Sequence, residues 1–394
     1  MNAYLNSLGI VSALGEGALV TRQHLFERDF TFLKVTDEYS PGFTCSVGQV
    51  SAGLPELVNV DTMHHTRNNQ ILLLALQQIE SEVRHACDQY GHDRVAIVLG
   101  TSTSGIAEVE PLFAQYVKSN HWQDAYDYGL QDIGSPAIFL AKYLGVTGPT
   151  FTVSTACSSG AKALASAKRL LALDVCDAVI AGGADSLCGL TVQGFTALEA
   201  TSKGVCNPFS INRDGINIGE GSAVFLMSKE VGSVRLSGVG ESSDAHHISA
   251  PDPSGDGAYR AMKLALANSS LKANEVNYIN LHGTGTEQND LMESKAVSRL
   301  FGNKVLCSST KPLTGHCLGA SGAIEAGLCW LLLQADHCNG LPAHPWDAEV
   351  DEKIEPISLV SEDNQCVADI RCVLSNSFAF GGSNISLLME KSFE

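Results

Sequence analysis

The chain of 394 residues carries 25 basic and 43 acidic side chains, which gives a formal net charge of −18. Binding to nucleic-acid phosphates requires a basic face, so this balance argues against nucleic acid as a partner. Hydrophobic residues make up 44% of the chain and charged residues 17%, as in a globular protein with extensive burial. No apolar stretch approaches the roughly 20 residues that span a membrane, so we expect no membrane insertion.

The cysteine pattern indicates a reducing compartment. Twelve cysteines occur, and no two are closer together than Cys366 and Cys372, so the chain has no C-x-x-C motif. We therefore expect neither a disulfide framework nor a zinc site. The first residues show neither the basic nor the apolar region of a secretory signal peptide. These features predict a cytoplasmic protein.

Short β-branched runs alternate with longer runs rich in Ala and Leu, a pattern that predicts an α/β fold. In chain order, strands are expected at residues 95–99, 178–181, 223–227 and 278–281. Helices are expected at residues 68–87, 136–144, 160–173, 258–269, 290–301 and 319–334. No low-complexity tract or proline-rich linker divides the chain.

The two halves of the chain contain matching elements in the same order. In each half a strand ends in a turn rich in Gly and Thr, a Ser/Thr/Cys turn precedes a helix of small residues, and a later strand closes on paired glycines. We interpret this match as a duplication and expect a first half at residues 1–230 and a second at residues 231–394. The alternative is that strand–glycine turns recur by chance in an α/β protein.

The segment around Cys157 predicts a strand, a sharp turn and a helix. An apolar run at residues 151–153 leads into the turn, and a run rich in Ala and Leu at residues 161–173 follows it. A thiol at a helix N-terminus meets unpaired N–H groups and the helix dipole. We therefore expect a pKa below the usual 8.5 or so and a nucleophilic cysteine. The alternative is a buried structural cysteine.

Two histidines lie in glycine-rich turns of the second half. His282 follows an expected strand and precedes Gly283-Thr284-Gly285-Thr286, and His316 closes the segment 311–316. The carboxyl ends of strands are where α/β sheets place their chemistry. A single histidine is more often structural, but two such histidines together with Cys157 predict a catalytic site.

Four segments resemble the signatures of the β-ketoacyl-acyl-carrier-protein synthases, which are thiolase-fold condensing enzymes of the elongating type. They are residues 155–160, 282–286, 311–316 and 376–384, with further matches at 208–209, 213–215 and 219–221. The resemblance implies a duplicated α/β fold layered α-β-α-β-α, with two mixed sheets around central helices. It implies no cofactor and no metal.

The resemblance also implies a reaction. Cys157 would accept an acyl group from an acyl-carrier-protein thioester, and a malonyl thioester would then lose carbon dioxide. The resulting enolate would attack the Cys157 thioester and lengthen the chain by two carbons. His282 and His316 would donate hydrogen bonds to the malonyl thioester carbonyl. The backbone N–H groups of Cys157 and Phe380 would form an oxyanion hole.

Charged residues would support these catalytic groups. Lys311 would set the electrostatics, with Glu325 as its counter-charge, because a buried lysine without a partner is costly. Asp290 and Glu293 would brace the site. For Glu293 an equally good alternative is an interaction of its carboxylate with the helix dipole.

Phe380 resembles the gating phenylalanine of the family, whose loop opens to admit acyl chains. The resemblance assigns gating or substrate-binding roles to Phe378, Ala379, Gly381, Asp244, His247 and Thr103. Ala379 stands where glycine is commoner, so we expect a stiffer gate. Glu287 replaces the usual proline after the second-half motif, which predicts altered loop geometry rather than lost activity.

The implied partner is an acyl carrier protein, which is itself acidic. Long-range steering would then be repulsive, and a local basic patch would carry the docking; Arg67 and Lys203 are the candidates, whereas Arg213 is expected to brace the interior. Family members are dimers that pair through the strand near residues 151–153. We expect a homodimer or a heterodimer with a sister subunit that lacks the cysteine.

Three functions remain open at the level of sequence. The first is an elongating condensing enzyme of fatty-acid synthesis, and the second is a specialised enzyme of a type II polyketide or aryl-polyene pathway, paired with a chain-length factor. The third is a non-catalytic scaffold, against which the intact Cys157, His282 and His316 argue. A thiolase acting on coenzyme A esters would need a different second-half constellation.

Overall fold

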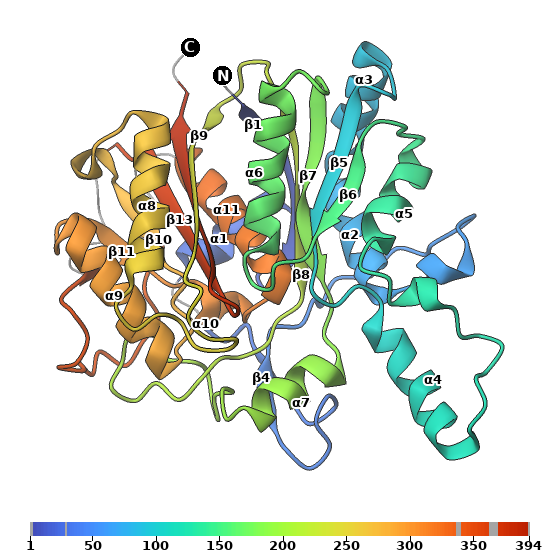
Figure 1. Ribbon diagram of the computed structural model, residues 1–394, viewed down its shortest axis with the longest axis horizontal. Helices are drawn as coiled ribbons and strands as arrows, with labels where there is room; N and C mark the ends of the chain where they lie inside the picture. Colours follow the sequence, from blue (N-terminus) through green and yellow to red (C-terminus); the bar gives the residue numbers. More distant parts are fainter. Residues whose placement is uncertain (1–2, 28–29, 336–339, 362–368, 393–394) are drawn as a thin grey trace.

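A computed structural model describes residues 3–27, 30–335, 340–361 and 369–392 (Figure 1). The α-helices are α1 (Ala18–Phe26), α2 (Arg67–Gln77), α3 (Glu80–Tyr90), α4 (Ile106–Ser119), α5 (Ser135–Leu144), α6 (Ser159–Ala172), α7 (Gly189–Ala197), α8 (Asp256–Ser269), α9 (Glu287–Phe301), α10 (Lys311–Thr314) and α11 (Leu318–Leu333). The strands are β1 (Tyr4–Ser12), β2 (Gly15–Glu16), β3 (Lys34–Thr36), β4 (Cys45–Val47), β5 (Val95–Gly100), β6 (Thr150–Val153), β7 (Ala178–Asp185), β8 (Gly221–Ser228), β9 (Val234–Ser243), β10 (Tyr278–Asn280), β11 (Leu306–Ser308), β12 (Ser358–Leu359), β13 (Cys372–Ala379) and β14 (Ser383–Lys391).

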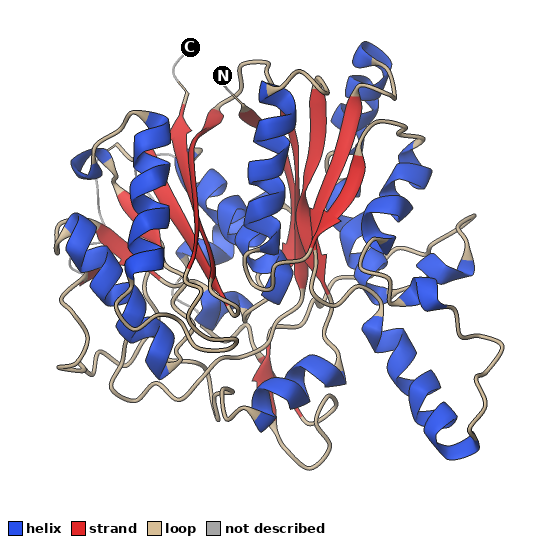
Figure 2. Cartoon of the chain, viewed as in Figure 1, coloured by secondary structure: helices blue, strands red, loops and turns tan. Residues whose placement is uncertain are grey.

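Two mixed sheets form the framework, as expected. One has the strand order β1-β8-β7-β5-β6 and the other β12-β11-β10-β13-β14-β9. A single pair of residues, Tyr4 and Arg235, joins their edges into one continuous path of strands. Figure 2 shows α6 between the two groups of strands.

Three apolar clusters account for the layers. The central cluster contains α6 and α11 together with residues from both sheets. A second cluster packs α2, α3 and α5 against the outer face of the first sheet, and a third packs α8 and α9 against the outer face of the second. The order is therefore α-β-α-β-α, the layered arrangement that the family resemblance implied.

Strand β7 shows why its sequence suits a central position. Ala178 and Ile180 contribute to the outer cluster, whereas Val179 and Ala181 contribute to the central one. Successive side chains of a strand point to opposite faces, so a strand covered on both faces is apolar throughout. All eight residues of β7 are buried.

Small residues bring the two central helices together. A Cβ atom added to Gly160 of α6 would lie 2.8 Å from the backbone nitrogen of Ala323, and one added to Gly322 of α11 would lie 2.8 Å from the Cβ of Ala161. Only glycine permits so close an approach. The contact places Cys157, just before α6, at the same end of the molecule as His316, just before α11.

The helix expected at residues 68–87 is two helices, α2 and α3. Gln78 lies between them, and its side chain bonds both backbone groups of Ile10 in β1, at 2.9 Å and 3.1 Å. Helices α4 and α7 were not among the expected elements. Among the described residues, no helix combines the length and hydrophobicity that a membrane crossing needs.

Candidate active site

The turn that presents Cys157 is tight. β6 ends at Val153, α6 begins at Ser159, and Ala156 between them has a positive φ of 52°. The hydroxyl of Ser159 donates to the carbonyl of Ala156 at 2.5 Å and accepts from the N–H of Thr155 at 2.8 Å. These two bonds hold a conformation that alanine rarely adopts and leave Cys157 at the head of the helix.

A separate framework holds His316. Its backbone N–H donates to the carbonyl of Asn217 at 2.6 Å, and its carbonyl accepts from the N–H of Gly219 at 2.9 Å. The two residues before His316, Thr314 and Gly315, pack closely against Gly48. A Cβ atom added to Gly48 would lie 2.0 Å from the carbonyl oxygen of Thr314. The histidine turn is therefore clamped by segments of the first half of the chain.

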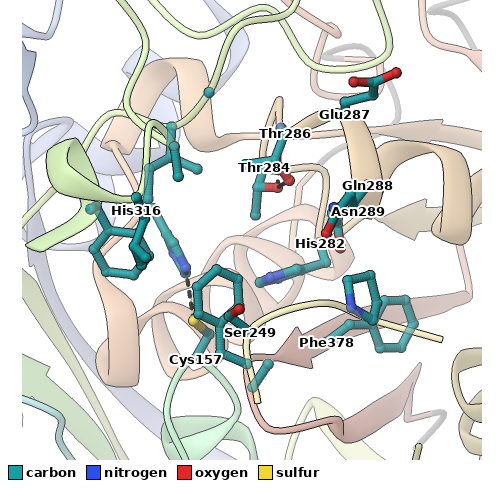
Figure 3. Close-up of a pocket in the computed structure, with 18 of the residues that line it drawn as sticks. Cys157, Ser249, His282, Thr284, Thr286, Glu287, Gln288, Asn289, His316 and Phe378 are labelled. Atoms are coloured by element: carbon teal, nitrogen blue, oxygen red, sulfur yellow. Dashed lines mark hydrogen bonds between the residues drawn. The ribbon is translucent and has the colours of Figure 1, made fainter. Parts of the chain in front are cut away.

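Cys157, His282 and His316 meet in the interior. The Sγ of Cys157 lies 3.0 Å from Nε2 of His316, whose Nδ1 lies 2.8 Å from the Oγ of Ser321. The rings of His282 and His316 are nearly perpendicular, at 81°, with centroids 5.4 Å apart. Figure 3 shows both imidazoles directed toward the sulfur. All three side chains border a cavity of about 550 Å³.

Burial controls the protonation of these groups. It raises the pKa of the Cys157 thiol to about 12, although Lys311 and the backbone N–H groups of Phe380 and Cys157 act in the opposite direction. The expected depression of this pKa is therefore wrong, because loss of hydration outweighs the favourable dipoles. Burial, followed by the charge of Lys311, lowers the pKa values of His282 and His316 well below 6.5. At neutral pH the thiol keeps its proton and both rings are neutral.

Lys311 and Glu325 form a buried ion pair, with exposed side-chain fractions of 1% and 3%. The ammonium group of Lys311 donates to Oε1 of Glu325. This is the pairing that the sequence predicted. Because Lys311 also lowers the pKa values of Cys157, His282 and His316, its charge reaches all three groups of the site.

Asp290 and Glu293 both brace backbone turns. Glu293 accepts hydrogen bonds from the N–H groups of His282 and Gly283, at 2.8 Å and 2.7 Å. Asp290 accepts from the N–H of Phe209 at 2.8 Å. Burial raises the pKa of Asp290 to about 6 and that of Glu293 to about 7. These contacts favour the bracing interpretation for Glu293. An interaction with the helix dipole is less favourable, because Glu293 lies beyond the first turn of α9.

The two loops that the sequence assigned to a gate are in contact. The N–H of Asp244 donates to the carbonyl of Gly382 at 2.9 Å, and the N–H of Gly381 donates to the carbonyl of Ile248 at 2.8 Å. Phe380 is 37% exposed, and its ring centroid lies 5.6 Å from that of Phe195 in α7.

The remaining gate residues occupy different environments. Phe378 and Ala379 are buried, and the Phe378 ring meets the His282 ring edge-on at 6.2 Å. His247 is exposed, and its ring accepts a hydrogen bond from the N–H of Ser249 at 3.2 Å. Among the predicted gate residues, Phe378, Ala379 and Phe380 border the cavity.

Thr103 and Arg67 lie outside the residues that border the described cavity, and both are engaged by buried carboxylates. Thr103 is buried, and its hydroxyl donates to Oδ1 of Asp185 at 2.7 Å, so it braces a loop and does not border the described cavity. Arg67 donates through Nε to Oε2 of the fully buried Glu220 at 2.8 Å. This internal ion pair engages the guanidinium that we expected to contact a carrier protein.

Lys203 is exposed, and its backbone N–H donates to Asp214, a residue at the edge of the cavity, at 3.2 Å. Arg213 is only 3% exposed and donates to Asp351 at 2.7 Å, as expected of an interior brace.

Several residues of the site escaped the sequence-based prediction. Phe195, Leu198 and Ile216 border the cavity, as do Thr284 and Thr286, whose hydroxyl oxygens lie 2.9 Å apart. The two threonines belong to the motif that follows His282, and their place in this motif is the sequence feature from which they could have been predicted. No feature of the sequence indicated Phe195 or Leu198, because they lie on or beside a helix that the sequence pattern did not predict.

The catalytic trio is also a set of metal-ligand types. Within the described residues, the ligand atoms of Cys157, His282 and His316 lie within 4.8 Å of one another. A thiolate and two imidazoles are donors that zinc accepts. The Sγ of Cys157 also lies 3.0 Å from Nε2 of His316, a contact that suits proton transfer between these two atoms.

Comparison with known proteins places the chain in a family. Residues 58–231 match the β-ketoacyl synthase N-terminal domain, and residues 234–340 match its C-terminal domain. The chain is 37% identical over 264 residues to 3-oxoacyl-[acyl-carrier-protein] synthase 2 of Rhizobium meliloti, an alignment that spans 62% of this chain and 61% of that relative. It is 30% identical to nodulation protein E of a Rhizobium species, over 88% of both chains.

A solved structure extends the similarity to the whole chain. The ketosynthase ApeO of Xenorhabdus doucetiae, in complex with its chain length factor ApeC, superposes with a TM-score of 0.94 at 42% identity. The alignment covers 99% of this chain and 98% of that one. With both family domains matched around a buried cysteine and two histidines, the chain belongs to the β-ketoacyl synthase family of acyl-transferring condensing enzymes.

Proposed function

We propose that the protein performs a decarboxylative Claisen condensation in which Cys157 carries the growing acyl chain. The observation that carries this proposal is the 3.0 Å contact between Cys157 Sγ and His316 Nε2, with the His282 ring beside it on the same cavity. One nucleophile and two neutral imidazoles satisfy the needs of this chemistry, which are an acyl acceptor and donors for an enolate oxygen.

The first step is acyl transfer. As the sulfur of Cys157 bonds to the thioester carbonyl carbon, its proton passes to Nε2 of His316. The backbone N–H groups of Cys157 and Phe380, which already act on the sulfur, stabilise the oxyanion. The carbon–sulfur bond of the incoming thioester then breaks, and the proton leaves with the carrier thiol.

The second step is decarboxylation and condensation. The carbon–carbon bond of the malonyl group breaks, carbon dioxide leaves, and the electron pair forms an enolate whose oxygen accepts hydrogen bonds from His282 and His316. For this step His316 carries its proton on Nε2 and accepts at Nδ1 from the Oγ of Ser321. The enolate carbon attacks the Cys157 thioester, the bond from carbon to the Cys157 sulfur breaks, and the sulfur takes up a proton from solvent, which restores the thiol. Each histidine donor is worth on the order of 3–4 kcal/mol of transition-state stabilisation.

Neighbouring groups support these steps. Burial keeps both imidazoles neutral and the charge of Lys311 adds to this effect, while Glu293 and Asp290 hold the turn at residues 282–285. Phe380 and the loops around Asp244 and Gly381 form the proposed gate to the cavity. We retain the division into halves at residues 1–230 and 231–394, which assigns the nucleophile to one half and both histidines to the other.

The proposed substrates are thioesters of an acyl carrier protein, the partner named in the Rhizobium meliloti relative. Lys203 is the proposed docking cation, because it is exposed and its backbone bonds a residue of the cavity rim. The described cysteines are all free, which supports a cytoplasmic location.

A specialised pathway with a paired subunit is the more specific candidate. Similarity to a ketosynthase solved with its chain length factor extends over 99% of the chain, at higher identity than the partial match to the synthase of Rhizobium meliloti. Strand β6 is the edge of the first sheet, and Phe151 on it is 39% exposed. An edge strand with an exposed aromatic residue suits pairing with a second subunit. Co-purification and native mass measurement would distinguish a heterodimer from a homodimer.

Mass spectrometry tests the proposed function. The protein is incubated with acyl-carrier-protein thioesters of graded chain length, and the site of acylation is mapped. We expect a thioester on Cys157, no adduct in Cys157→Ala, and an unchanged adduct in Cys188→Ala, which removes another buried thiol. Absence of an adduct with every chain length would favour a scaffold instead.

A further inference from the structure

The carboxylate of Asp185 links the two halves of the chain beside the active site. Asp185 ends β7 and is fully buried. Its Oδ1 accepts from the hydroxyls of Thr101 and Thr103 at 2.7 Å and from the N–H groups of Ser102 and Thr103 at 2.8 Å. Its Oδ2 accepts from the N–H of Ala320 at 3.1 Å.

The hydrogen bond from the N–H of Ala320 places Asp185 at the start of α11. Ala320 lies in the first turn of this helix, and the residue before the helix, Cys317, offers no side-chain cap of its own. The first N–H groups of a helix lack partners within the helix and carry a partial positive charge. The N–H of Ala320 also donates to the carbonyl of Cys317 at 2.9 Å, so a carboxylate from the first half shares this donor and caps a helix of the second half.

The fit between these elements is close. A Cβ on Gly319 would lie 2.8 Å from Oδ2 of Asp185 and 2.7 Å from the Oγ of Ser102. α11 therefore packs directly on the loop that follows β5, and a shift of the carboxylate would shift the first turn of the helix with it.

The first turn of α11 is also what orients His316. Ser321 follows Ala320 directly, and its Oγ lies 2.8 Å from Nδ1 of His316. One turn further on, Glu325 holds Lys311. Asp185 forms no hydrogen bond with Cys157 or His316. Its charge contributes to the raised pKa of the Cys157 thiol, and its hydrogen bond to Ala320 reaches His316 through the first turn of the helix.

We propose that Asp185 is a positioning residue that sets His316 opposite Cys157 by anchoring the first turn of α11 to the first half of the chain. This inference deepens the proposed function and rests on it for its kinetic consequence. It also gives Thr103 a role, because both donor groups of that residue hold the carboxylate.

The test compares Asp185→Asn with Asp177→Asn, the same substitution at a half-buried residue just before β7, where the side chain pairs with Arg94. Asparagine keeps the size of aspartate but directs an N–H₂ group toward donors. In histidine-labelled protein, the NMR resonance of His316, assigned with His316→Ala, should move in Asp185→Asn and stay in place in Asp177→Asn. A loss of folded protein alone would weaken the resonance without moving it.

The kinetic readout uses carrier-protein substrates. Misplacement of a catalytic group by about 1 Å can cost 100-fold, so we expect kcat of Asp185→Asn to fall by about 10- to 100-fold with KM almost unchanged. An unmoved resonance and an unchanged kcat would overturn the proposal. A moved resonance in a protein whose wild type catalyses no condensation would instead reject the proposed function and keep the positioning role.

A milder variant covers the case in which Asp185→Asn does not fold. Thr103→Val removes one hydroxyl donor to Oδ1 and keeps the shape of the side chain. We expect it to move the His316 resonance in the same direction by a smaller amount. If Thr103→Val folds with an unmoved resonance and full kcat while Asp185→Asn does not fold, Asp185 serves folding alone and the proposal is rejected.

Discussion

At the level of single residues, burial decides the chemistry of Cys157. A helix N-terminus favours a thiolate, but the sulfur lies in the interior, where the loss of hydration raises its pKa to about 12. Nε2 of His316 is the acceptor at 3.0 Å, and its own pKa is low. In the proposed reaction, the thiolate would therefore form as proton transfer accompanies attack, because burial favours the protonated thiol beforehand.

The pH dependence of alkylation tests this conclusion. Iodoacetamide reacts with thiolates, and the thiolate fraction rises about tenfold per pH unit below the pKa. We expect the alkylation rate of Cys157, followed by peptide mass spectrometry, to keep rising from pH 7 to pH 10 without a plateau. A plateau near pH 8.5 or below would show that the helix dipole outweighs burial after all.

Substitutions in the Lys311–Glu325 pair are expected to change stability and activity independently. Lys311→Met leaves a buried carboxylate without its partner and should lower the free energy of unfolding by about 3–5 kcal/mol in urea titrations. Adding Glu325→Leu removes the orphaned charge and should restore most of that stability. Turnover should stay low in both variants, because burial still lowers the pKa values of the imidazoles but the positive charge that acts on both imidazoles and on the Cys157 sulfur is gone. Recovery of turnover in the double variant would refute an electrostatic role for Lys311.

At the level of elements, the catalytic residues lie in turns whose backbones are held by other segments. The turn at His316 is clamped by residues 217–219 and by Gly48, and the turn at His282 is held by Glu293 on α9. These contacts join segments that are far apart in the sequence. The geometry of the site therefore depends on the packing of elements as much as on the motifs themselves.

Gly48→Ala should disturb this clamp. The added Cβ would lie 2.0 Å from the carbonyl oxygen of Thr314, so the turn before His316 must shift. We expect lower kcat, a lower thermal midpoint, and unchanged KM. Gly53→Ala is the matched control, because a Cβ there meets nothing within 4 Å. Equal effects of the two substitutions would mean that the clamp has no special role.

Glu293 predicts a pH effect on stability. Burial raises its pKa to about 7 from an ordinary 4.5, so the folded protein holds a proton that the unfolded chain has released in this range. Its contribution therefore favours folding most at low pH and declines as the pH rises from 4.5 through 7. Relative to wild type, Glu293→Gln should gain unfolding free energy over this window. A constant difference between the two proteins would show that Glu293 does not titrate there.

At the level of the whole molecule, the charge of −18 opposes the approach of an acidic carrier protein. Salt should weaken this repulsion, because the Debye length falls from about 30 Å at 0.01 M to about 8 Å at 0.15 M. We expect KM for carrier-bound substrate to fall over this range, with kcat constant. A rising KM would indicate that local attraction dominates.

Lys203→Glu isolates the local contribution to docking. The substitution should raise KM at every salt concentration without changing kcat, because Lys203 is exposed and lies outside the residues that border the cavity. Lys118→Glu, at the end of α4, has the same change of charge and is the control. A change in kcat alone would argue against a docking role for Lys203.

The sequence by itself determined the α/β class, and its resemblance to a known family predicted the layers and the three side chains proposed to react. Periodicity and glycine turns are local signals, so they predicted β5, α6 and α11 to within one residue at each end, whereas β7 continues for four residues beyond the predicted end at residue 181. The pairing of Lys311 with Glu325 was also predictable, because a buried lysine needs a counter-charge.

Only the tertiary structure decided how these groups behave. The pKa of Cys157, the internal ion pair of Arg67 with Glu220, and the engagement of Thr103 by Asp185 all depend on side chains that the fold brings together from distant segments. Burial and long-range hydrogen bonds are properties of the packed molecule, and no motif encodes them locally. The residues of the reaction were therefore readable in the chain, whereas their protonation and alignment follow from the interior that surrounds them.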